Sequence, residues 1–256
     1  MHLDDQRLLG RQLANARADH ELISSTPFES IASLDDAYRV QNQAIAAYGS
    51  TQTGYKIGAT NPAVQQLFNC NEPFYGPLFD SEHLQGSTGI EQFPGMLGGE
   101  AEFAFRCGSD FPDDDLVLTD LPALILACHV AVEIVGRRLQ GTGLPPLNSA
   151  IADYGVSVAF ITGAAISDWQ QKDLSAVAVT ASSNGEQTNS GTGAAVMGNP
   201  LNAILWLHNT LRQHSSGLKA GDWISTGTCL GVIAPVEGVK VDVNFAGCGS
   251  LSYQIG

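Results

Sequence analysis

The segment GGEAEFAF, residues 98–105, places two carboxylates inside an otherwise apolar run. Glu100 and Glu102 are separated by one residue, and the alternation of Ala and Phe around them is typical of a β-strand. Residues two apart on a strand point to the same face, so both glutamates face one way. Because the burial of unpaired carboxylates costs several kcal/mol, we expect a positive partner opposite them.

A third glutamate stands alone in another apolar, strand-like run, HVAVEIVGRR. Together with Glu100 and Glu102, this Glu133 would supply three carboxylates from two strands, which suits a hard cation such as Mg²⁺ or Mn²⁺. The sequence has no Cys or His spacing of the kind that zinc sites use. In the alternative, Glu100 and Glu102 lie on a solvated sheet face, and Glu133 pairs with Arg137 or Arg138. The spacing alone leaves both interpretations open.

Three further side chains could move protons. Lys56 lies between glycines in GYKIGAT, where it could donate a proton or stabilise an enolate, and the alternative is an ordinary surface lysine. Asp153 in ADYGVSVAF could accept a proton or orient Lys56, or it could be a turn aspartate. Asp80, which follows FYGPLF, has the same two interpretations.

Composition excludes several functional classes. The chain of 256 residues carries a net charge of -14, which would repel the phosphate backbone and argues against nucleic-acid binding. Its N-terminus is too polar for a signal peptide, and its longest apolar stretch is short for a membrane span. Five scattered cysteines without a CxxC pair fit a reducing compartment. We therefore expect a cytoplasmic protein that binds neither membranes nor nucleic acids.

The first fifty residues predict a helical segment. In SLDDAYRVQNQAIAAYG, Ser33 is a suitable N-cap, apolar residues recur at helical spacing, and Gly49 ends the pattern. The composition then changes, with more Gly, Pro and β-branched residues. We expect residues 1–50 to form a helical N-terminal segment and residues 51–256 to form the metal-binding catalytic body as one structural unit.

The body predicts an α+β fold with antiparallel or mixed sheet. Asn184 and Gly185 lie between two alternating runs, which indicates a hairpin with a tight primed turn. VKVDVNF alternates apolar and polar residues as a half-buried strand does. Asn199 and Pro200 begin an amphipathic helix, as cap and first helical residue.

These segments together resemble the 2-oxopent-4-enoate (2-hydroxypentadienoate) hydratase and 4-oxalocrotonate decarboxylase family, within the fumarylacetoacetate hydrolase superfamily. The resemblance covers nearly the whole chain. It is carried by eight segments in order: GYKIGATNPAVQQLF, FYGPLFD, GEAEFAF, AVEIVGRRL, IADYGVSVAFITG, SSNGEQTNSGTGAAVMGNPLNAILWL, GDWISTGTCLG and GCGSLS.

The resemblance implies a rolled mixed β-sheet body of the fumarylacetoacetate hydrolase C-terminal type. It also implies that Mg²⁺ or Mn²⁺ binds to Glu100, Glu102 and Glu133. Homo-oligomers built from dimers are expected, in line with a charged fraction of only 15%. The resemblance leaves room for a complex with another enzyme of the same catabolic pathway.

The same resemblance assigns the active-site lysine to Lys56 and the active-site aspartate to Asp153, with Asp80 near a further family acid. Members act on small 2-oxo acids that pass through an enol or dienolate. A hydratase protonates the dienol at its far end and adds water to the conjugated double bond. We expect Leu78 and Phe79 to line the pocket for the substrate tail.

The reaction within the family depends on details of three positions. Hydratases often have DNAS where this chain has DYGV, so Tyr154 and Val156 depart from the pattern, as does Thr192 where hydratases often have Arg. We favour hydration of 2-hydroxypenta-2,4-dienoate in aromatic hydrocarbon catabolism. The alternatives are a 4-oxalocrotonate-type decarboxylase, an acylpyruvate C–C hydrolase and a non-enzymatic metal-binding partner of an active paralogue.

Overall fold

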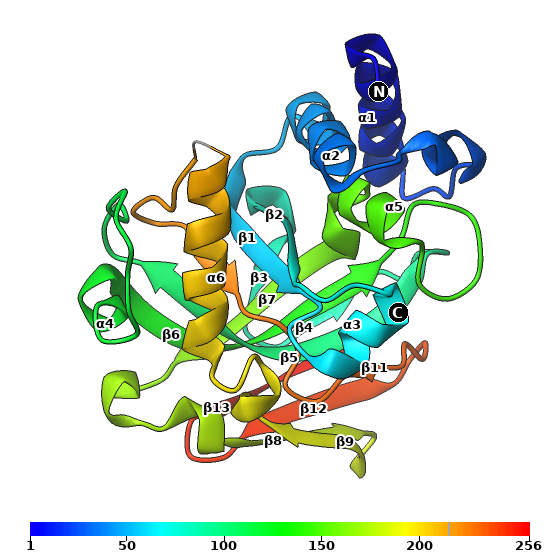
Figure 1. Cartoon of the computed structure of the whole chain (residues 1–256). Helices are drawn as coiled ribbons and strands as arrows, with labels where there is room; N and C mark the ends of the chain where they lie inside the picture. Colours follow the sequence, from blue (N-terminus) through cyan, green and yellow to red (C-terminus); the bar gives the residue numbers. More distant parts are fainter. Residues whose placement is uncertain (215) are drawn as a thin grey trace.

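The fold is built on two β-sheets (Figure 1). The structure is a computed structural model and describes residues 1–214 and 216–256. The larger sheet has the strand order β2-β1-β10-β5-β6-β7-β3, with β11 paired to β5. Its strands are β1 (Gln52–Gly58), β2 (Phe74–Phe79), β3 (His83–Gln85), β5 (Met96–Cys107), β6 (Ile125–Gly136), β7 (Ser157–Ala165), β10 (Trp223–Ser225) and β11 (Val232–Ile233).

The smaller sheet has the order β4-β13-β12-β8-β9 and lies below the larger one in Figure 1. Its strands are β4 (Thr88–Ile90), β8 (Ala178–Ser183), β9 (Glu186–Thr192), β12 (Lys240–Phe245) and β13 (Gly249–Ile255). The main core lies between the sheets, where the Phe103 ring of β5 meets the Phe245 ring of β12 edge-on at 5.1 Å. The predicted hairpin is confirmed, because Asn184 and Gly185 join β8 to β9 with φ of 49° and 88°.

The strand directions are mixed. β1 runs parallel to β10, and β3 runs parallel to β7. From β10 through β5 and β6 to β7, each strand is antiparallel to the next one across the sheet. The expected α+β class with a curled mixed sheet is therefore confirmed. The long antiparallel pair of β5 and β6 forms the middle of the sheet and carries all three glutamates.

The helices cover the larger sheet at its upper end and along one face (Figure 1). They are α1 (Leu3–Ala18), α2 (Leu34–Tyr48), α3 (Pro62–Phe68), α4 (Leu121–Leu124), α5 (Leu147–Ala152) and α6 (Pro200–Gln213). Ser33 caps α2 by accepting from the Asp36 amide at 3.2 Å, and Gly49 ends it with φ of 79°. Asn199 caps α6 by accepting from the Leu201 amide at 2.9 Å. Both sequence-based cap predictions are confirmed.

The N-terminal helices share a second core with the body. Leu13 of α1 and Val40 of α2 belong to one buried cluster with Phe79 of β2 and Ile151 of α5. Residues 1–50 therefore form helices, as predicted, and these helices pack directly on the body. Within residues 1–214 and 216–256, the helices are too short or too polar to cross a bilayer. The five cysteines are all free thiols.

Candidate active site

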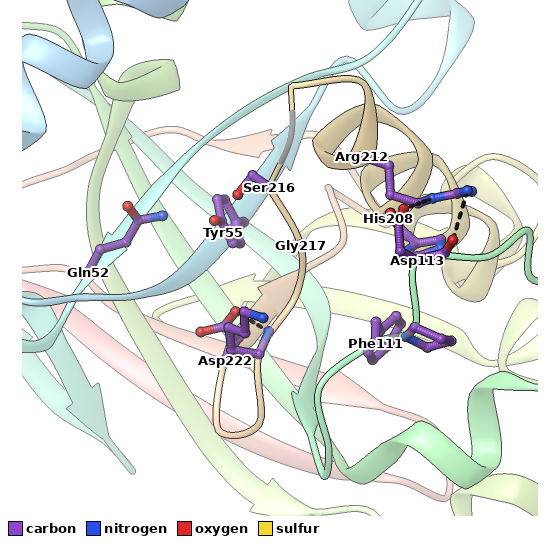
Figure 2. A pocket seen from close by; sticks show the side chains of 11 residues that line it. Gln52, Tyr55, Phe111, Asp113, His208, Arg212, Ser216, Gly217 and Asp222 are labelled. Carbon is purple, nitrogen blue, oxygen red and sulfur yellow. Dashed lines mark hydrogen bonds and ion pairs between the residues drawn. The ribbon is translucent and has the colours of Figure 1, made fainter.

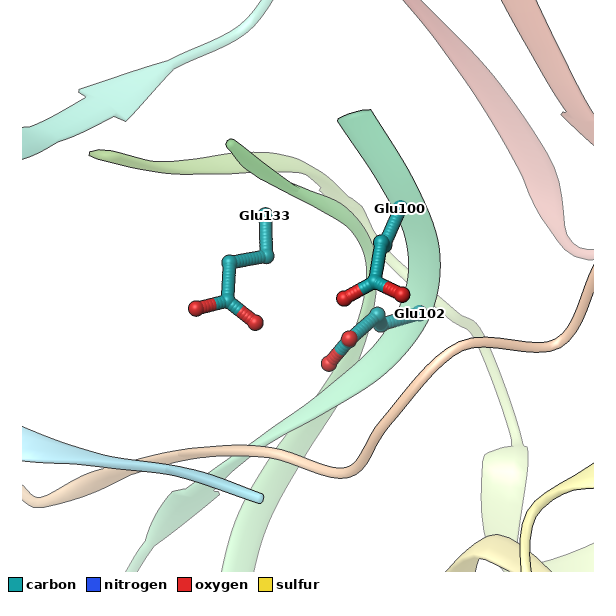
Figure 3. A group of neighbouring side chains, drawn as sticks. All are labelled: Glu100, Glu102 and Glu133. Carbon is teal, nitrogen blue, oxygen red and sulfur yellow. The ribbon is translucent and has the colours of Figure 1, made fainter. Parts of the chain in front are cut away.

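The register of β5 and β6 brings the three glutamates together. Glu100 of β5 lies directly opposite Glu133 of β6, and Glu102 follows two residues along β5 on the same face. One carboxylate oxygen of each glutamate lies within 4.8 Å of the others, as Figure 3 illustrates. The two strands thus gather three acidic groups at one point, as the first of the two interpretations of the sequence requires.

Burial separates this cluster from an ordinary solvated sheet face. The Glu102 and Glu133 residues are fully buried, and Glu100 is partly buried. Glu102 Oε2 accepts from Ser225 Oγ at 2.6 Å and from the Gly227 amide at 2.8 Å. The other oxygen, Glu102 Oε1, has no hydrogen-bond partner within the part of the chain that the structure describes, and neither does Glu133 Oε1.

The positive partner expected opposite the glutamates is Lys56 of β1. Its side chain is 2% exposed, and its ammonium lies 3.0 Å from Glu133 Oε2. That contact is an ion pair without hydrogen-bond geometry, and the ammonium donates instead to the Gly155 carbonyl at 3.1 Å. The interpretation of Lys56 as a surface residue is therefore wrong.

One ammonium does not balance three carboxylates. Burial raises the pKa of Glu100 to about 7, with Glu133 adding to the shift and Lys56 opposing it. Burial also raises the pKa of Glu102 well above its usual range, and the charges of Glu133 and Glu100 raise it further. Burial would lower the pKa of Lys56, but the surrounding carboxylates outweigh it and leave that pKa raised. The site has an excess of negative charge.

The donor set fits a divalent cation. Unpartnered carboxylate oxygens on Glu102 and Glu133 are buried beside each other and beside Glu100. Oxygen ligands of this kind suit Mg²⁺ or Mn²⁺, whose charge would offset the carboxylate excess. Carboxylates must be deprotonated to bind a metal, so the cation would take the place of the protons that burial favours.

The arginines after β6 have other partners than Glu133, contrary to the alternative considered from the sequence. Arg138 forms a buried ion pair with Asp153 and donates its backbone N–H to Asp153 Oδ2 at 2.7 Å. Arg137 donates to the Gly143 carbonyl at 3.0 Å. Lys56 is the cation that contacts Glu133.

Asp153 does not orient Lys56 by direct contact, which corrects one sequence-based interpretation. Both of its carboxylate oxygens accept from Arg138, and the residue is fully buried. It instead fixes the start of the segment Tyr154–Val156, whose Gly155 carbonyl accepts from the Lys56 ammonium. Asp153 is thus linked to Lys56 only through the backbone that follows it, among the contacts of the described residues.

The segment Tyr154–Val156 has an unusual backbone. All three residues are left-handed, with φ of 55°, 62° and 58°. This conformation is costly for a β-branched residue such as Val156. It persists where surrounding contacts over-determine it, and such segments cluster at functional sites.

Arg17 of α1 supplies part of that support. Its guanidinium donates to the carbonyls of Ser157 at 2.8 Å and Val158 at 3.2 Å, and it lies 4.6 Å from the Tyr154 ring centre. An ion pair with Glu82 holds it in place. No local sequence pattern marks this arginine, because its partners lie far along the chain. Ser225 and Gly227, which hold Glu102, do lie in one of the family-like segments, GDWISTGTCLG.

Three predicted positions lie away from the cluster. Asp80 is exposed and lies four residues along the chain from Gly76, the residue of β2 that pairs with Lys56 of β1. That separation is on the order of 13 Å along a strand, so the structure does not bring Asp80 to the site. Leu78 packs in a small core with Trp223, and Phe79 packs in the core of the N-terminal helices. The expectation that Leu78 and Phe79 line the tail pocket is wrong.

A cavity of about 490 Å³ opens beside the glutamates. Lys56 and Glu100 form its polar wall. The other side chains around it are mostly apolar and come from β1, α3, β2, β5, β6, β11 and the loops between them. They include Ile57, Val64, Leu67, Phe68, Phe74, Leu97, Val135, Leu144, Val156 and Val232. A small substrate could thus contact the carboxylate cluster at one end and apolar groups at the other.

A second cavity of about 710 Å³ lies near the C-terminal end of α6, as Figure 2 shows. Among the described residues that line it are neither the three glutamates nor Lys56. Its Arg212 already donates to Asp113 and Asp115, both at 2.8 Å, and its Lys219 pairs with Asp110 at 3.2 Å. Its cationic groups are therefore already engaged.

Comparison with known proteins gives a consistent result. The model of the fumarylacetoacetate (FAA) hydrolase C-terminal family matches residues 83–255. The "TodF product hydratase" of Pseudomonas putida is 34% identical over 86% of this chain and 83% of its own. A "2-keto-4-pentenoate hydratase" of Paraburkholderia xenovorans is 30% identical, again over 86% of this chain and 83% of its own.

A solved structure extends the similarity over the full length. The 4-oxalocrotonate decarboxylase from Pseudomonas putida G7, complexed with magnesium and adipate, superposes with a TM-score of 0.91. It is 26% identical and covers 100% of this chain and 99% of its own.

Proposed function

Since the chain belongs to the fumarylacetoacetate hydrolase C-terminal family and matches hydratases over most of its length, we propose that it is a divalent-metal-dependent hydratase of small unsaturated 2-oxo acids. The proposed reaction converts 2-hydroxypenta-2,4-dienoate to 4-hydroxy-2-oxopentanoate. The observation that carries the proposal is the buried cluster of Glu100, Glu102 and Glu133 with Lys56 beside it, at the wall of a cavity of about 490 Å³.

The proposed metal ligands are Glu100, Glu102 and Glu133. A bound Mg²⁺ or Mn²⁺ would stabilise negative charge that develops on the 2-oxo oxygen of the substrate. Support comes from the unpartnered oxygens of the cluster and from the magnesium in the structurally similar decarboxylase. Ser225 Oγ and the Gly227 amide would keep Glu102 oriented, since both donate to Oε2 and Oε1 stays available for the metal.

Lys56 is the proposed proton carrier. Hydration requires that the dienol lose its hydroxyl proton and gain one at C5, after which water adds at C4 and a proton returns to C3. Among the described residues that line the cavity, Lys56 is the only one with a cationic side chain. Its ammonium contacts Glu133 and donates to the Gly155 carbonyl. We assign Asp153 a supporting role through Arg138 and the segment that carries Gly155.

Decarboxylation is the second candidate, because the 4-oxalocrotonate decarboxylase covers the whole chain with a TM-score of 0.91. Hydrolysis of an acylpyruvate has less support. Superfamily hydrolases often supply a His–Glu pair from an N-terminal loop, and the early histidines here are His2 and His20. No histidine lines the 490 Å³ cavity among the described residues.

The test is a substrate panel with Mn²⁺-loaded protein: 2-hydroxypenta-2,4-dienoate, 4-oxalocrotonate and an acylpyruvate. We expect loss of the dienol absorbance and formation of 4-hydroxy-2-oxopentanoate with the first compound. Release of CO₂ from the second without hydration of the first would replace the proposal by a decarboxylase. Cleavage of the third alone would replace it by a hydrolase.

We also propose a homo-oligomer built from dimers. The chain is only 15% charged, and Leu3, Leu8 and Leu34 on the N-terminal helices are each about half exposed. Apolar surface of this kind is typical of subunit contacts. Sedimentation at micromolar concentration should give a species of at least twice the chain mass of 26.9 kDa. A monomer under those conditions would refute this assembly.

A further inference from the structure

The apolar part of the 490 Å³ cavity has no assigned role in the proton transfers. Its volume falls in the range of roughly 300–1,000 Å³ that holds drug-sized ligands, so it exceeds what a five-carbon acid requires. The space beyond the carboxylate cluster is therefore available for a substrate tail longer than a vinyl group.

The charged lining is confined to one end. Among the described residues around the cavity, Lys56 and Glu100 are the charged ones, and both belong to the carboxylate cluster. The nearby polar groups have other contacts: Asn61 caps α3 through the Val64 amide at 3.0 Å, and Thr228 donates to the Gly231 carbonyl at 3.1 Å. A second carboxylate on the tail would meet no cation there, and burying it unpaired is costly.

Exposed apolar side chains gather at the same cavity. Leu67 is 70% exposed, Val232 44% and Leu144 37%, and all three line it. Single exposed leucines need no explanation, but a group of them around one opening marks a site for an apolar ligand. These three residues form what we call the apolar rim.

We propose that this cavity selects 2-oxo acids with an extended uncharged hydrocarbon tail, and that the apolar rim disfavours a second carboxylate. The inference rests on the proposed function for the binding of the 2-oxo acid end, and it adds the chemical class of the tail. It also separates the two candidate reactions, since 4-oxalocrotonate carries a carboxylate at its far end and pentadienoate does not.

The first experiment extends the dienol substrate by methylene groups at its far end. Each added methylene should raise kcat/KM about fourfold until the tail passes the apolar rim. A flat or falling series would overturn the proposal.

The second experiment measures binding without turnover. Calorimetry with Mn²⁺-loaded protein compares 2-oxohexanoate with 2-oxohexanedioate, which differ only in the terminal carboxylate. The monocarboxylate should bind at least about tenfold more tightly. Binding is measured in place of turnover, because turnover would not report affinity for the dicarboxylate. An apolar site can speed the loss of the terminal carboxylate as CO₂ even when the protein binds the dicarboxylate weakly.

A positive charge at the apolar rim should weaken the preference for the monocarboxylate. Leu67→Arg places a cation on an exposed position of α3, where the fold tolerates it, and should narrow the binding ratio at least about tenfold. Leu126→Arg is the matched control, because Leu126 is 66% exposed on β6 and does not line the cavity. The control should leave the ratio unchanged.

The outcomes separate the two levels of inference. Equal binding of both acids to the unmodified protein, or equal shifts in Leu67→Arg and Leu126→Arg, would overturn the tail selectivity alone. Tight binding of 2-oxohexanoate without hydration of any dienol would overturn the reaction and retain the selectivity. Failure of both acids to bind the Mn²⁺-loaded protein would overturn both.

Discussion

Replacement of Lys56 by methionine should lower turnover of the best dienol substrate by about 10²–10⁴-fold, the usual contribution of a positioned acid or base. Methionine nearly keeps the length of the stem in the buried space beside Glu133, but it removes the ammonium that contacts Glu133 and Gly155. If the lysine acts mainly in the transition state, kcat should fall more than substrate affinity. Steady-state kinetics in saturating Mn²⁺ measures both.

The assay contains saturating Mn²⁺ for a reason. Lys56→Met removes the ammonium beside three buried carboxylates, and without a metal ion their uncompensated charge would destabilise the fold. Lys172→Met is the matched control: Lys172 is exposed and lies outside the cavity lining. It should retain normal turnover. Full activity of Lys56→Met with unchanged Mn²⁺ binding would show that the lysine is not the proton carrier.

Glu102→Gln should weaken Mn²⁺ binding by at least about 100-fold. Mutation of a group that only orients a metal ligand typically lowers the metal affinity by about 10–100-fold, and mutation of a direct ligand should lower it at least as much. The amide oxygen can keep the bonds from Ser225 Oγ and the Gly227 amide, which both reach Oε2. The NH₂ group then replaces Oε1, the unpartnered atom that we assign to the metal.

Two measurements check this variant. Calorimetry gives the Mn²⁺ affinity directly, and thermal unfolding reports it independently, because a ligand that binds the folded state raises the melting temperature. Mn²⁺ should raise that temperature in the unmodified protein and in Glu186→Gln, an exposed control with the same loss of charge. It should have little effect on Glu102→Gln. An unchanged Mn²⁺ affinity in Glu102→Gln would exclude the carboxylate cluster as the metal site.

Local signals predicted most of the elements that carry the site. The period of two around Glu100 and Glu102 fixed their common face, and the strands β5 and β6 formed as the apolar runs indicated. The caps at Ser33 and Asn199 and the turn at Asn184 act within a few residues, so short sequence windows contain their cause.

Partner choice between distant elements was not predictable in the same way. Asp153 pairs with Arg138 because β6 and β7 bring the segments beside them together, and no local pattern announces that contact. The tail pocket was expected at Leu78 and Phe79, but the antiparallel register places Lys56 opposite Gly76, so Phe74 at the other end of β2 faces the cavity. Strand register follows from global packing, which a single strand does not encode.

The contact between Arg17 and the Ser157 and Val158 carbonyls bears on how small a working version of this enzyme could be. The family model matches residues 83–255, which include the three glutamates, whereas Lys56 and Arg17 both precede that stretch. A gene fragment trimmed to the matched stretch would encode the acidic ligands without the ammonium, and without the guanidinium that braces a left-handed backbone beside it. If Lys56 carries protons as proposed, the stretch needed for catalysis is longer than the stretch by which the family is recognised. A graft of the sheet into another protein would then have to include α1 and β1.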